Sequence, residues 1–387
     1  MTDPLGARAI LDRLVSFPTV SRDSNLALID WVEEYLAGHG VAAHRVYDET
    51  GTKAALYANV GPEVEGGVVL SGHTDVVPVD GQSWASDPFT VTERDGRLYG
   101  RGTADMKGFD ALALAAVPWA LEAGVKRPLQ IALSYDEEVG CLGAPPMIED
   151  MAHHLPMAGC AIIGEPTMLR PVTSHKGTCG WFVTMKGFEV HSSLMDRGVS
   201  AIMEGARLID WCNGMNDRIR ARTPEGLAAS FDPPFSTVHV GVISGGTAPN
   251  ITAGRCTFSV DIRVVPGDDI ADFEAEFLDK VAEIEAGMQA VRPEAGIEVV
   301  RRSIVPALVP RNGDPAEELV RALTGDNGTH VVSYGTEAGQ FQERGHSAVV
   351  CGPGDIAQAH QGDEYIETRQ FKAGEAFLRR LIDRLAA

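Results

Sequence analysis

Residues 66–75, GGVVLSGHTD, run from two glycines through a short apolar stretch to a histidine and an aspartate. Two later segments have the same character, LQIALSY at 129–135 and GCAIIGEP at 159–166. Continuous apolar runs of this length are typical of strands that are buried on both faces of a parallel sheet. Segments with helical apolar spacing lie before and between them, including one at about 105–122 that Gly124 should end. The pattern therefore predicts an α/β domain with a mainly parallel sheet.

The middle of the chain has a different pattern. Strand-like and helix-like segments between 177 and 307 follow in the order β-α-β-β-α-β, which is typical of ferredoxin-like α+β domains. In CTFSVDIRV, 256–264, apolar and polar residues alternate, so one face of this strand should be buried and the other open. We therefore predict one α/β domain, formed by 1–176 and 308–387, that is interrupted by an inserted domain at 177–307.

Composition limits the classes of partner. The chain has 33 Lys and Arg residues against 54 Asp and Glu, a formal net charge of −21, which argues against nucleic acid and anionic membranes as partners. We expect no signal peptide, because no cationic segment leads into an apolar one at the start, and the longest apolar run, ALALAAVPWAL, is too short to span a membrane. Six scattered cysteines without a CxxC pair indicate reduced thiols in the cytoplasm.

Acidic residues and histidines gather where the predicted strands end. Open α/β sheets place their ligand sites at this edge, so we expect these side chains to lie close together. Without a cation the carboxylates would repel one another and several would stay protonated. Each motif alone is typical of a solvated turn or loop, but two imidazoles and three carboxylates together suit two zinc-like ions that share one carboxylate. The candidate metal ligands are His73, Asp105, Glu138, Glu165 and His360.

Six motifs, SGHTDVVPVDG, LYGRGTADMKG, DEEVGCLGA, GEPT, GFEVHSS and AQAHQGDEYI, resemble those of the M20 metallopeptidase family in composition and order. The resemblance spans nearly the whole chain and implies two divalent ions, which we expect to be zinc, with cobalt able to replace it. It implies that His73, Asp105 and Glu165 hold one ion. The other ion would be held by Asp105, Glu138 and His360, with Asp105 as the bridge.

The resemblance also implies two residues that act beside the metals. Glu137 matches the general base, and its position next to Glu138 lets it reach the site without binding metal and take a proton from water. Asp75 matches the acid that orients His73, an arrangement that fixes the tautomer of a ligating histidine; a turn residue is the alternative. The family further implies a cis peptide bond after Asp105.

In the inserted domain, His191 of GFEVHSS matches a histidine that reaches the active site of the partner subunit and stabilises the oxyanion. The resemblance thus implies a homodimer formed through the inserted domain, which would serve as a lid and dimerisation domain. The rest of the chain would form the catalytic domain. Taken without its motif, His191 would be read as a free surface histidine.

Several further residues match family positions that contact the substrate, with Asn250 and Arg263 placed at its α-carboxylate. Arg263 lies on the predicted open face of its strand, where an ion pair with Asp261 or Glu189 is the alternative. An exposed loop lysine is the alternative for Lys176. The candidate substrate contacts are Asn250, Arg263, Thr336, Glu337 and Lys176.

The stretches SFPTVSRDSNLALIDWV and YGTEAGQF are similar to the acetylornithine deacetylase branch of the family. The similarity implies a small-molecule substrate, N2-acetyl-L-ornithine, which would be hydrolysed to ornithine and acetate for arginine biosynthesis. Ala104 departs from that branch, where many members have cysteine before the bridging aspartate. The alternatives are a deacylase for another N-acyl amino acid, such as N-acetylcitrulline or succinyl-diaminopimelate, and a metal-free binding protein.

Overall fold

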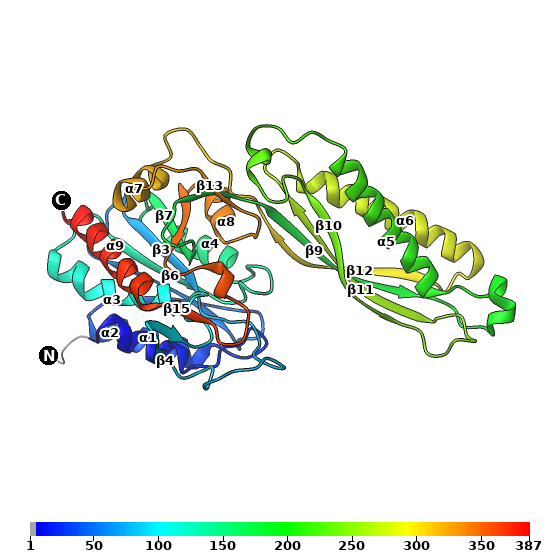
Figure 1. The fold of residues 1–387 in the computed structure, drawn as a ribbon, viewed down its shortest axis with the longest axis horizontal. Helices are drawn as coiled ribbons and strands as arrows, with labels where there is room; N and C mark the ends of the chain where they lie inside the picture. Colours follow the sequence, from blue (N-terminus) through cyan, green and yellow to red (C-terminus); the bar gives the residue numbers. More distant parts are fainter. Residues whose placement is uncertain (1–4) are drawn as a thin grey trace. The chain divides into compact units, whose positions relative to one another are not determined.

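The structure is a computed structural model that describes residues 5–387, and it divides into two compact units (Figure 1). The first unit comprises the described residues up to Ser174 together with Leu308–His330 and Thr336–Ala387. The second unit comprises His175–Ala307 and the short segment Val331–Gly335, which lies outside the insertion that we predicted at 177–307.

An eight-stranded sheet in the order β1-β2-β6-β3-β7-β14-β8-β13 forms the centre of the first unit, and two of its strands, β8 and β13, end in residues assigned to the second unit. Strands β6, β3, β7 and β14 pair in parallel, whereas β1 and β2 are antiparallel to their neighbours and β8 is antiparallel to β14. The prediction of a mainly parallel α/β sheet is confirmed. The strands are β1 Ala43–Tyr47, β2 Ala54–Val60, β3 Val68–His73, β6 Leu129–Ser134, β7 Cys160–Pro166, β8 Val172–His175, β13 His330–Val332 and β14 Ala348–Gly352.

Helices cover both faces of this sheet. On β2, Leu56 and Ala58 join the apolar core beneath α1, α2, α3 and α9, whereas Tyr57 points the other way and donates a hydrogen bond to Asp150 of α4. Helix α3 ends at Gly124 in the left-handed conformation, φ +59°, as its sequence predicted. The helices are α1 Ala7–Val15, α2 Leu26–Gly38, α3 Lys107–Ala123, α4 Ala144–His154, α7 Pro315–Thr324, α8 Ala338–Glu343 and α9 Thr368–Ala386.

A small antiparallel sheet in the first unit brings two distant segments together. Its order is β15-β5-β4, with Tyr365 of β15 opposite Tyr99 of β5. The pairing places the residues after β5 beside those before β15, and both segments carry candidate metal ligands. The elements are β4 Thr92–Arg94, β5 Arg97–Tyr99, β15 Tyr365–Glu367 and the short 3-10 helix η3 Ile356–Gln358.

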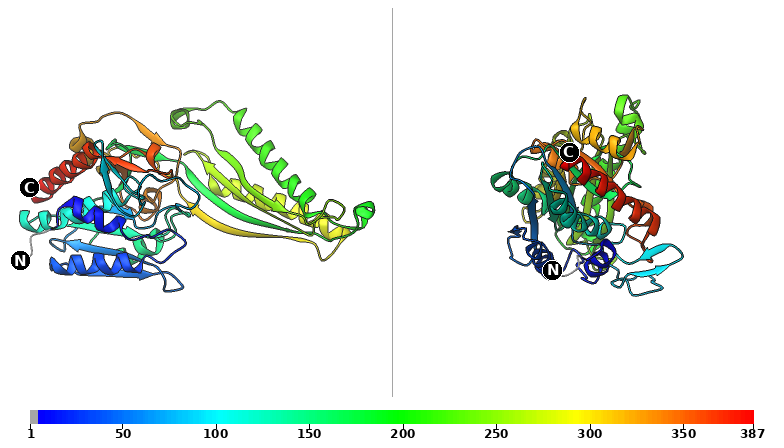
Figure 2. Two further views of the ribbon diagram at one scale, coloured as in Figure 1. Left: turned by 60° about the horizontal axis from the view of Figure 1, so that its bottom comes forward. Right: turned by 90° about the vertical axis from the view of Figure 1, so that its left-hand side faces the viewer.

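The second unit is a four-stranded antiparallel sheet in the order β10-β11-β9-β12, with α5 and α6 along one face (Figure 2). This order is the ferredoxin-like arrangement that the sequence predicted. In β11 the alternate residues Cys256, Phe258, Val260, Ile262 and Val264 are buried against the helices, as their spacing indicated. The elements are β9 Gly177–Lys186, η1 Ser192–Arg197, α5 Ala201–Arg220, η2 Gly226–Ser230, β10 Thr237–Gly245, β11 Arg255–Val264, α6 Ile270–Val291 and β12 Gly296–Val305.

Across residues 5–387, no helix combines the length and the apolar character that crossing a membrane requires.

Candidate active site

Parallel strands bring the candidate metal ligands to one edge of the large sheet. His73 is the last residue of β3, Glu165 lies near the end of the neighbouring β7, and Glu138 follows β6 on the other side of β3. Asp105 lies just before α3, and His360 follows β14 and η3. Since the carboxyl ends of neighbouring parallel strands meet at one edge, segments that are distant in the sequence form a single cluster.

Asp105 lies between the two histidines. Its Oδ1 is 3.1 Å from His73 Nε2, and its Oδ2 is 3.2 Å from His360 Nε2. The same nitrogen of His360 is 2.9 Å from Glu138 Oε2. Each oxygen of Asp105 therefore faces a different histidine, which is the orientation that a carboxylate shared by two cations requires.

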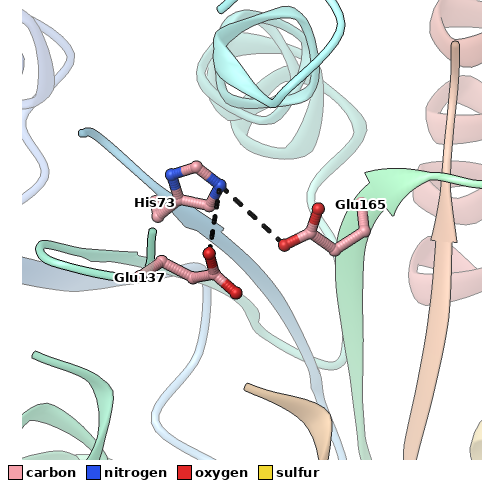
Figure 3. Close-up of side chains that lie close together, drawn as sticks. All are labelled: His73, Glu137 and Glu165. Carbon is pink, nitrogen blue, oxygen red and sulfur yellow. Dashed lines mark ion pairs between the residues drawn. The ribbon is translucent and has the colours of Figure 1, made fainter. Parts of the chain in front are cut away.

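His73 also faces two glutamates, as Figure 3 shows. Its Nε2 is 3.8 Å from Glu165 Oε1 and 4.0 Å from Glu137 Oε2. Within 5–387, two groups of side chains have ligand atoms near enough to one another to hold a metal ion. They are His73 with Glu137 and Glu165, and His73 with Asp105 and Glu138.

Asp75 contacts both His73 and the segment that carries Glu137 and Glu138. The ring Nδ1 of His73 lies 2.9 Å from the backbone carbonyl of Asp75 and 3.5 Å from its carboxylate. The same carboxylate accepts a hydrogen bond from Ser21 Oγ at 2.6 Å and another from the backbone N–H of Glu137 at 3.1 Å. One buried aspartate therefore contacts both His73 and the backbone that carries the two adjacent glutamates.

The three adjacent acids, Asp136, Glu137 and Glu138, do not share one environment. Asp136 has a left-handed backbone, φ +56°, and its carboxylate lies 2.5 Å from Lys53 Nζ. Both side chains of this pair are about 15% exposed. Lys53 neutralises the first acid of the run, while the next two project toward the histidines.

Burial makes the carboxylates hard to ionise in the absence of a cation. It raises the pKa of Glu137 to about 8 and that of Glu138 to about 7, and it raises the pKa of Glu165 well above its usual value, with repulsion from neighbouring carboxylates adding to each shift. Hydrogen bonds to Asp105 and Glu138 raise the pKa of His360 to about 10. The cluster thus needs added positive charge, which protons supply in acid and divalent ions could supply at neutral pH.

Two predicted substrate contacts, Thr336 and Glu337, are buried in the first unit. The Thr336 hydroxyl accepts a hydrogen bond from the Ala338 N–H at 3.1 Å, at the start of α8. Glu337 is 2% exposed and accepts hydrogen bonds from Ser71, at 3.0 Å, and from Ser134. Ser71 and Ser134 belong to β3 and β6, so the Glu337 carboxylate contacts the large sheet.

His191 and Asn250 lie on adjacent segments of the second unit. His191 forms an isolated bridge with Ile251, and the N–H of Ser192 donates to the Asn250 carbonyl at 2.9 Å. The His191 ring is exposed, and its Nδ1 lies 2.8 Å from Ser193 Oγ. An exposed ring that is oriented by a neighbouring hydroxyl leaves Nε2 directed away from that contact.

Arg263 and Lys176 are both held by contacts within the second unit. Arg263 Nε is 3.0 Å from Asp261 Oδ2, the ion pair that we gave as the alternative to substrate binding. Lys176 is 1% exposed and donates hydrogen bonds of 2.8 Å to the carbonyls of Pro233 and Phe235, so the alternative of an exposed loop lysine is wrong. Burial lowers the pKa of Lys176 to about 8. The substrate roles of both residues stay predictions.

The structure adds residues that the sequence analysis did not single out. Besides Ser21 and Lys53, the Cys141 thiol lies 3.3 Å from Glu137 Oε1, and an Arg101–Glu364 ion pair lies beside Asp105. Arg101 and Glu364 could have been found in the sequence, because they are charged residues inside the motifs RGTAD and HQGDE. The cis peptide bond expected after Asp105 is present.

The comparison with known families agrees with this geometry. The model of peptidase family M20/M25/M40 matches residues 69–384, a range that contains all five candidate metal ligands. The chain belongs to this family. The resemblance found in the six motifs is thereby confirmed.

Two relatives match over nearly their whole length. The acetylornithine deacetylase of Myxococcus xanthus is 38% identical and covers 99% of this chain and 98% of its own. The acetylornithine deacetylase of Pasteurella multocida (strain Pm70) is 34% identical and covers 95% of each chain. Together with the family, they show that the chain is an enzyme, a hydrolase that acts on amides.

A solved structure shows the same fold. The M20 family metallo-carboxypeptidase Sso-CP2 from Sulfolobus solfataricus aligns with a TM-score of 0.79 over 98% of this chain and 99% of its own, at 18% identity. At this identity the likeness concerns the fold alone. This chain and Sso-CP2 therefore share a fold.

Proposed function

We propose that this protein is a two-metal amidohydrolase that cleaves N2-acetyl-L-ornithine to L-ornithine and acetate. The observation that carries the proposal is the position of Asp105, whose two oxygens face His73 and His360 separately, at 3.1 and 3.2 Å. A single bound cation would need only one of these contacts, whereas a carboxylate shared by two cations uses both oxygens.

The donor set fits zinc-like ions. His73, Asp105 and Glu165 would hold one ion, and Asp105, Glu138 and His360 the other, so each ion receives one imidazole and two carboxylates. Bound divalent ions would lower the pKa of a water molecule and polarise the scissile carbonyl. We expect zinc, with cobalt as an active substitute.

Glu137 is proposed as the general base. Glu138 lies 2.9 Å from His360, and this contact supports Glu138 as the metal ligand of the two adjacent glutamates and Glu137 as the group that transfers the proton. The Glu137 carboxylate would accept a proton from the attacking water as the water oxygen bonds to the acetyl carbon. It would then pass this proton to the amide nitrogen as the C–N bond breaks, so that ornithine leaves as a neutral amine.

Two observations support N2-acetyl-L-ornithine as the substrate. Both relatives are named acetylornithine deacetylases, and the chain shares motifs with that branch of the family. A panel assay tests it, with zinc- or cobalt-loaded protein and N-acetylornithine, N-acetylcitrulline, other N-acetyl amino acids and succinyl-diaminopimelate. We expect the highest kcat/KM for N-acetylornithine. If another compound of the panel were preferred tenfold in kcat/KM, that compound would replace N-acetylornithine as the proposed substrate. If metal-loaded protein hydrolysed no compound of the panel, the proposed amidohydrolase activity would be contradicted.

The assembly is part of the same proposal. We expect a cytoplasmic homodimer formed through the second unit, with His191 serving the active site of the other copy and Asn250 and Arg263 contacting the α-carboxylate. Exposed apolar side chains on the second unit, including Met195, Met203 and Val242, support an interface there, since they are 57%, 57% and 68% exposed. Sedimentation analysis of the full chain tests the dimer.

A further inference from the structure

A buried ion pair joins the two segments that carry Asp105 and His360. Arg101 Nη1 lies 2.6 Å from Glu364 Oε2, and both side chains are 1% exposed. Removing two charges from water is unfavourable unless their remaining polar atoms also find partners. The partners of this pair therefore indicate what the pair is arranged to hold.

The second oxygen of Glu364 binds the backbone of Asp105. Glu364 Oε1 accepts hydrogen bonds from the N–H of Ala104 at 3.0 Å and from the N–H of Asp105 at 3.2 Å. The Glu364 carbonyl accepts a third from the N–H of Gly100 at 2.9 Å. Glu364 therefore accepts hydrogen bonds from three backbone N–H groups of the segment 100–105.

Arg101 reaches the backbone on the other side. Its Nη1 donates to the Gln361 carbonyl at 3.3 Å, and its Nη2 donates to the side chain of Gln82. Gln82 Nε2 in turn donates to the His360 carbonyl at 2.8 Å. The ring of Trp84 lies 5.1 Å from the guanidinium carbon and covers it. His360 has a left-handed backbone, φ +64°, and these contacts hold the carbonyl of that residue.

The network thus ties the backbones of two candidate ligands to one buried pair. A small rotation of the peptide before Asp105 would move both carboxylate oxygens away from the two histidines. We propose that Glu364, held in place by Arg101, is a positioning residue that orients Asp105 between His73 and His360. This inference rests on the proposed two-metal site, and outer residues of this kind are known to tune metal sites through their ligands.

The competing explanation is a link that only stabilises the fold. The two explanations differ when both charges are replaced together by apolar residues. Such a replacement often leaves stability nearly unchanged, because no charge remains buried without a partner. It would nevertheless remove the acceptor for the N–H groups of Ala104 and Asp105, so a positioning role would be lost while the fold is kept.

The test compares the full-length wild-type chain with the double variant Arg101→Met/Glu364→Leu and the single variant Glu364→Gln. The control is Arg321→Met/Glu317→Leu, which removes a partly exposed ion pair of 2.8 Å on α7 in the same unit. Three quantities are measured: the affinity for Zn²⁺ and Co²⁺ by equilibrium dialysis and calorimetry, the visible absorption spectrum of bound Co²⁺, and the thermal unfolding of the metal-free protein.

We expect the double variant to stay folded without metal, at an unfolding temperature lowered by the two N–H groups left without an acceptor. It should bind at least one ion about 10- to 100-fold more weakly, with an altered Co²⁺ spectrum. Glu364→Gln should weaken binding less. Its single amide oxygen cannot serve both Arg101 and the two N–H groups, but it can still serve one of them. The control variant should match the wild type in affinity and spectrum.

Wild-type affinity and spectrum in the folded variants would overturn the inference. If the double variant fails to fold, Glu364→Gln decides by the same two measurements. Metal binding by the wild-type protein distinguishes failure of the positioning inference from failure of the proposed function. If it binds no divalent ion, the proposed two-metal function fails and the inference with it, whereas tight binding by wild type and variants alike contradicts the inference alone.

Discussion

Lys53 Nζ lies 2.5 Å from Asp136 Oδ1, so the first of three adjacent carboxylates is neutralised by a cation more than eighty positions earlier in the chain. The pairing explains how an acidic run can follow a buried strand. Asp136 is held by Lys53, and its left-handed backbone turns the next two acids toward the histidines. The positive charge for Glu137 and Glu138 must come from elsewhere, and bound metal ions are the proposed source.

Lys53→Met should therefore destabilise the fold without removing the metals. The change leaves a half-buried carboxylate without its charged partner, a loss of about 1.5–3 kcal/mol in the free energy of unfolding. Denaturant titration measures this loss, and the double variant Lys53→Met/Asp136→Asn should recover part of it. Loss of bound metal in a folded Lys53→Met protein would contradict the separation between this pair and the metal cluster.

Glu137→Gln should abolish turnover while the metals stay bound. Glutamine keeps the shape but cannot take the proton of water, and a general base contributes on the order of 10²–10⁴-fold to the rate. Glu138→Gln is the matched variant next to it and should weaken one metal site. Metal content and kcat are measured for both. If Glu137→Gln lost metal and Glu138→Gln did not, the two roles would have to be exchanged.

The metal-free protein should lose stability as the pH rises. The pKa of Glu137 is about 8 against an ordinary value of 4.5, and that of His360 is about 10 against 6.5, so both groups favour the protonated form when folded. Each contribution is complete below the unfolded pKa and is lost as the pH rises through the folded one. The pKa of Asp105 is shifted downward, so its contribution is lost only in acid.

Thermal unfolding with a chelator, at pH values from about 5 to 9, measures this loss. Metal ligands must be deprotonated, so metal binding strengthens over the same range and should offset it. The gap between the unfolding temperatures of metal-loaded and metal-free protein should therefore widen with pH. A metal-free unfolding temperature that rises steadily from pH 5 to 9 would show that the buried acids do not control stability.

Most of the fold could be predicted from the sequence, because strands, helices and their buried faces depend on the local spacing of apolar residues. Short apolar runs predicted the parallel strands, and alternation in 256–264 predicted the buried face of β11. His73 and Glu165 were predicted to lie close together because each lies at the end of a strand, and neighbouring parallel strands end at the same edge of the sheet. Lys176 shows the limit of such reasoning, since no local pattern indicates that a lysine is buried against the carbonyls of Pro233 and Phe235.

The parts that could not be predicted depend on pairing between distant segments. The roles of Arg101 and Glu364 follow from the register of β5 and β15, in which Tyr99 lies opposite Tyr365. Asp75 was predicted to orient His73, but its contact with the Glu137 N–H requires the register of β3 against β6. The sequence identifies the side chains inside the motifs, whereas their hydrogen-bond and ion-pair partners depend on the tertiary structure.

His191→Ala should reduce turnover without changing metal content. The imidazole is proposed to donate a hydrogen bond to the tetrahedral oxyanion, and removing one such donor costs roughly 10²–10³-fold in kcat. His239→Ala is a suitable control, because His239 is another exposed histidine of the second unit. Metal analysis accompanies the kinetics. A His191→Ala enzyme with wild-type kcat would remove this residue from the mechanism.

Mixing two inactive variants tests whether His191 serves the other copy. In a mixed dimer of His191→Ala and Glu137→Gln chains, a histidine acting on the partner leaves one site with both groups damaged and the other with both intact. Activity should therefore reappear on subunit exchange, up to about one working site in each mixed dimer. A histidine acting within its own chain leaves one damaged group in every site, so no activity returns. Exchange is followed with two differently tagged chains, and an inactive mixture in which mixed dimers have demonstrably formed would place His191 at the active site of its own chain.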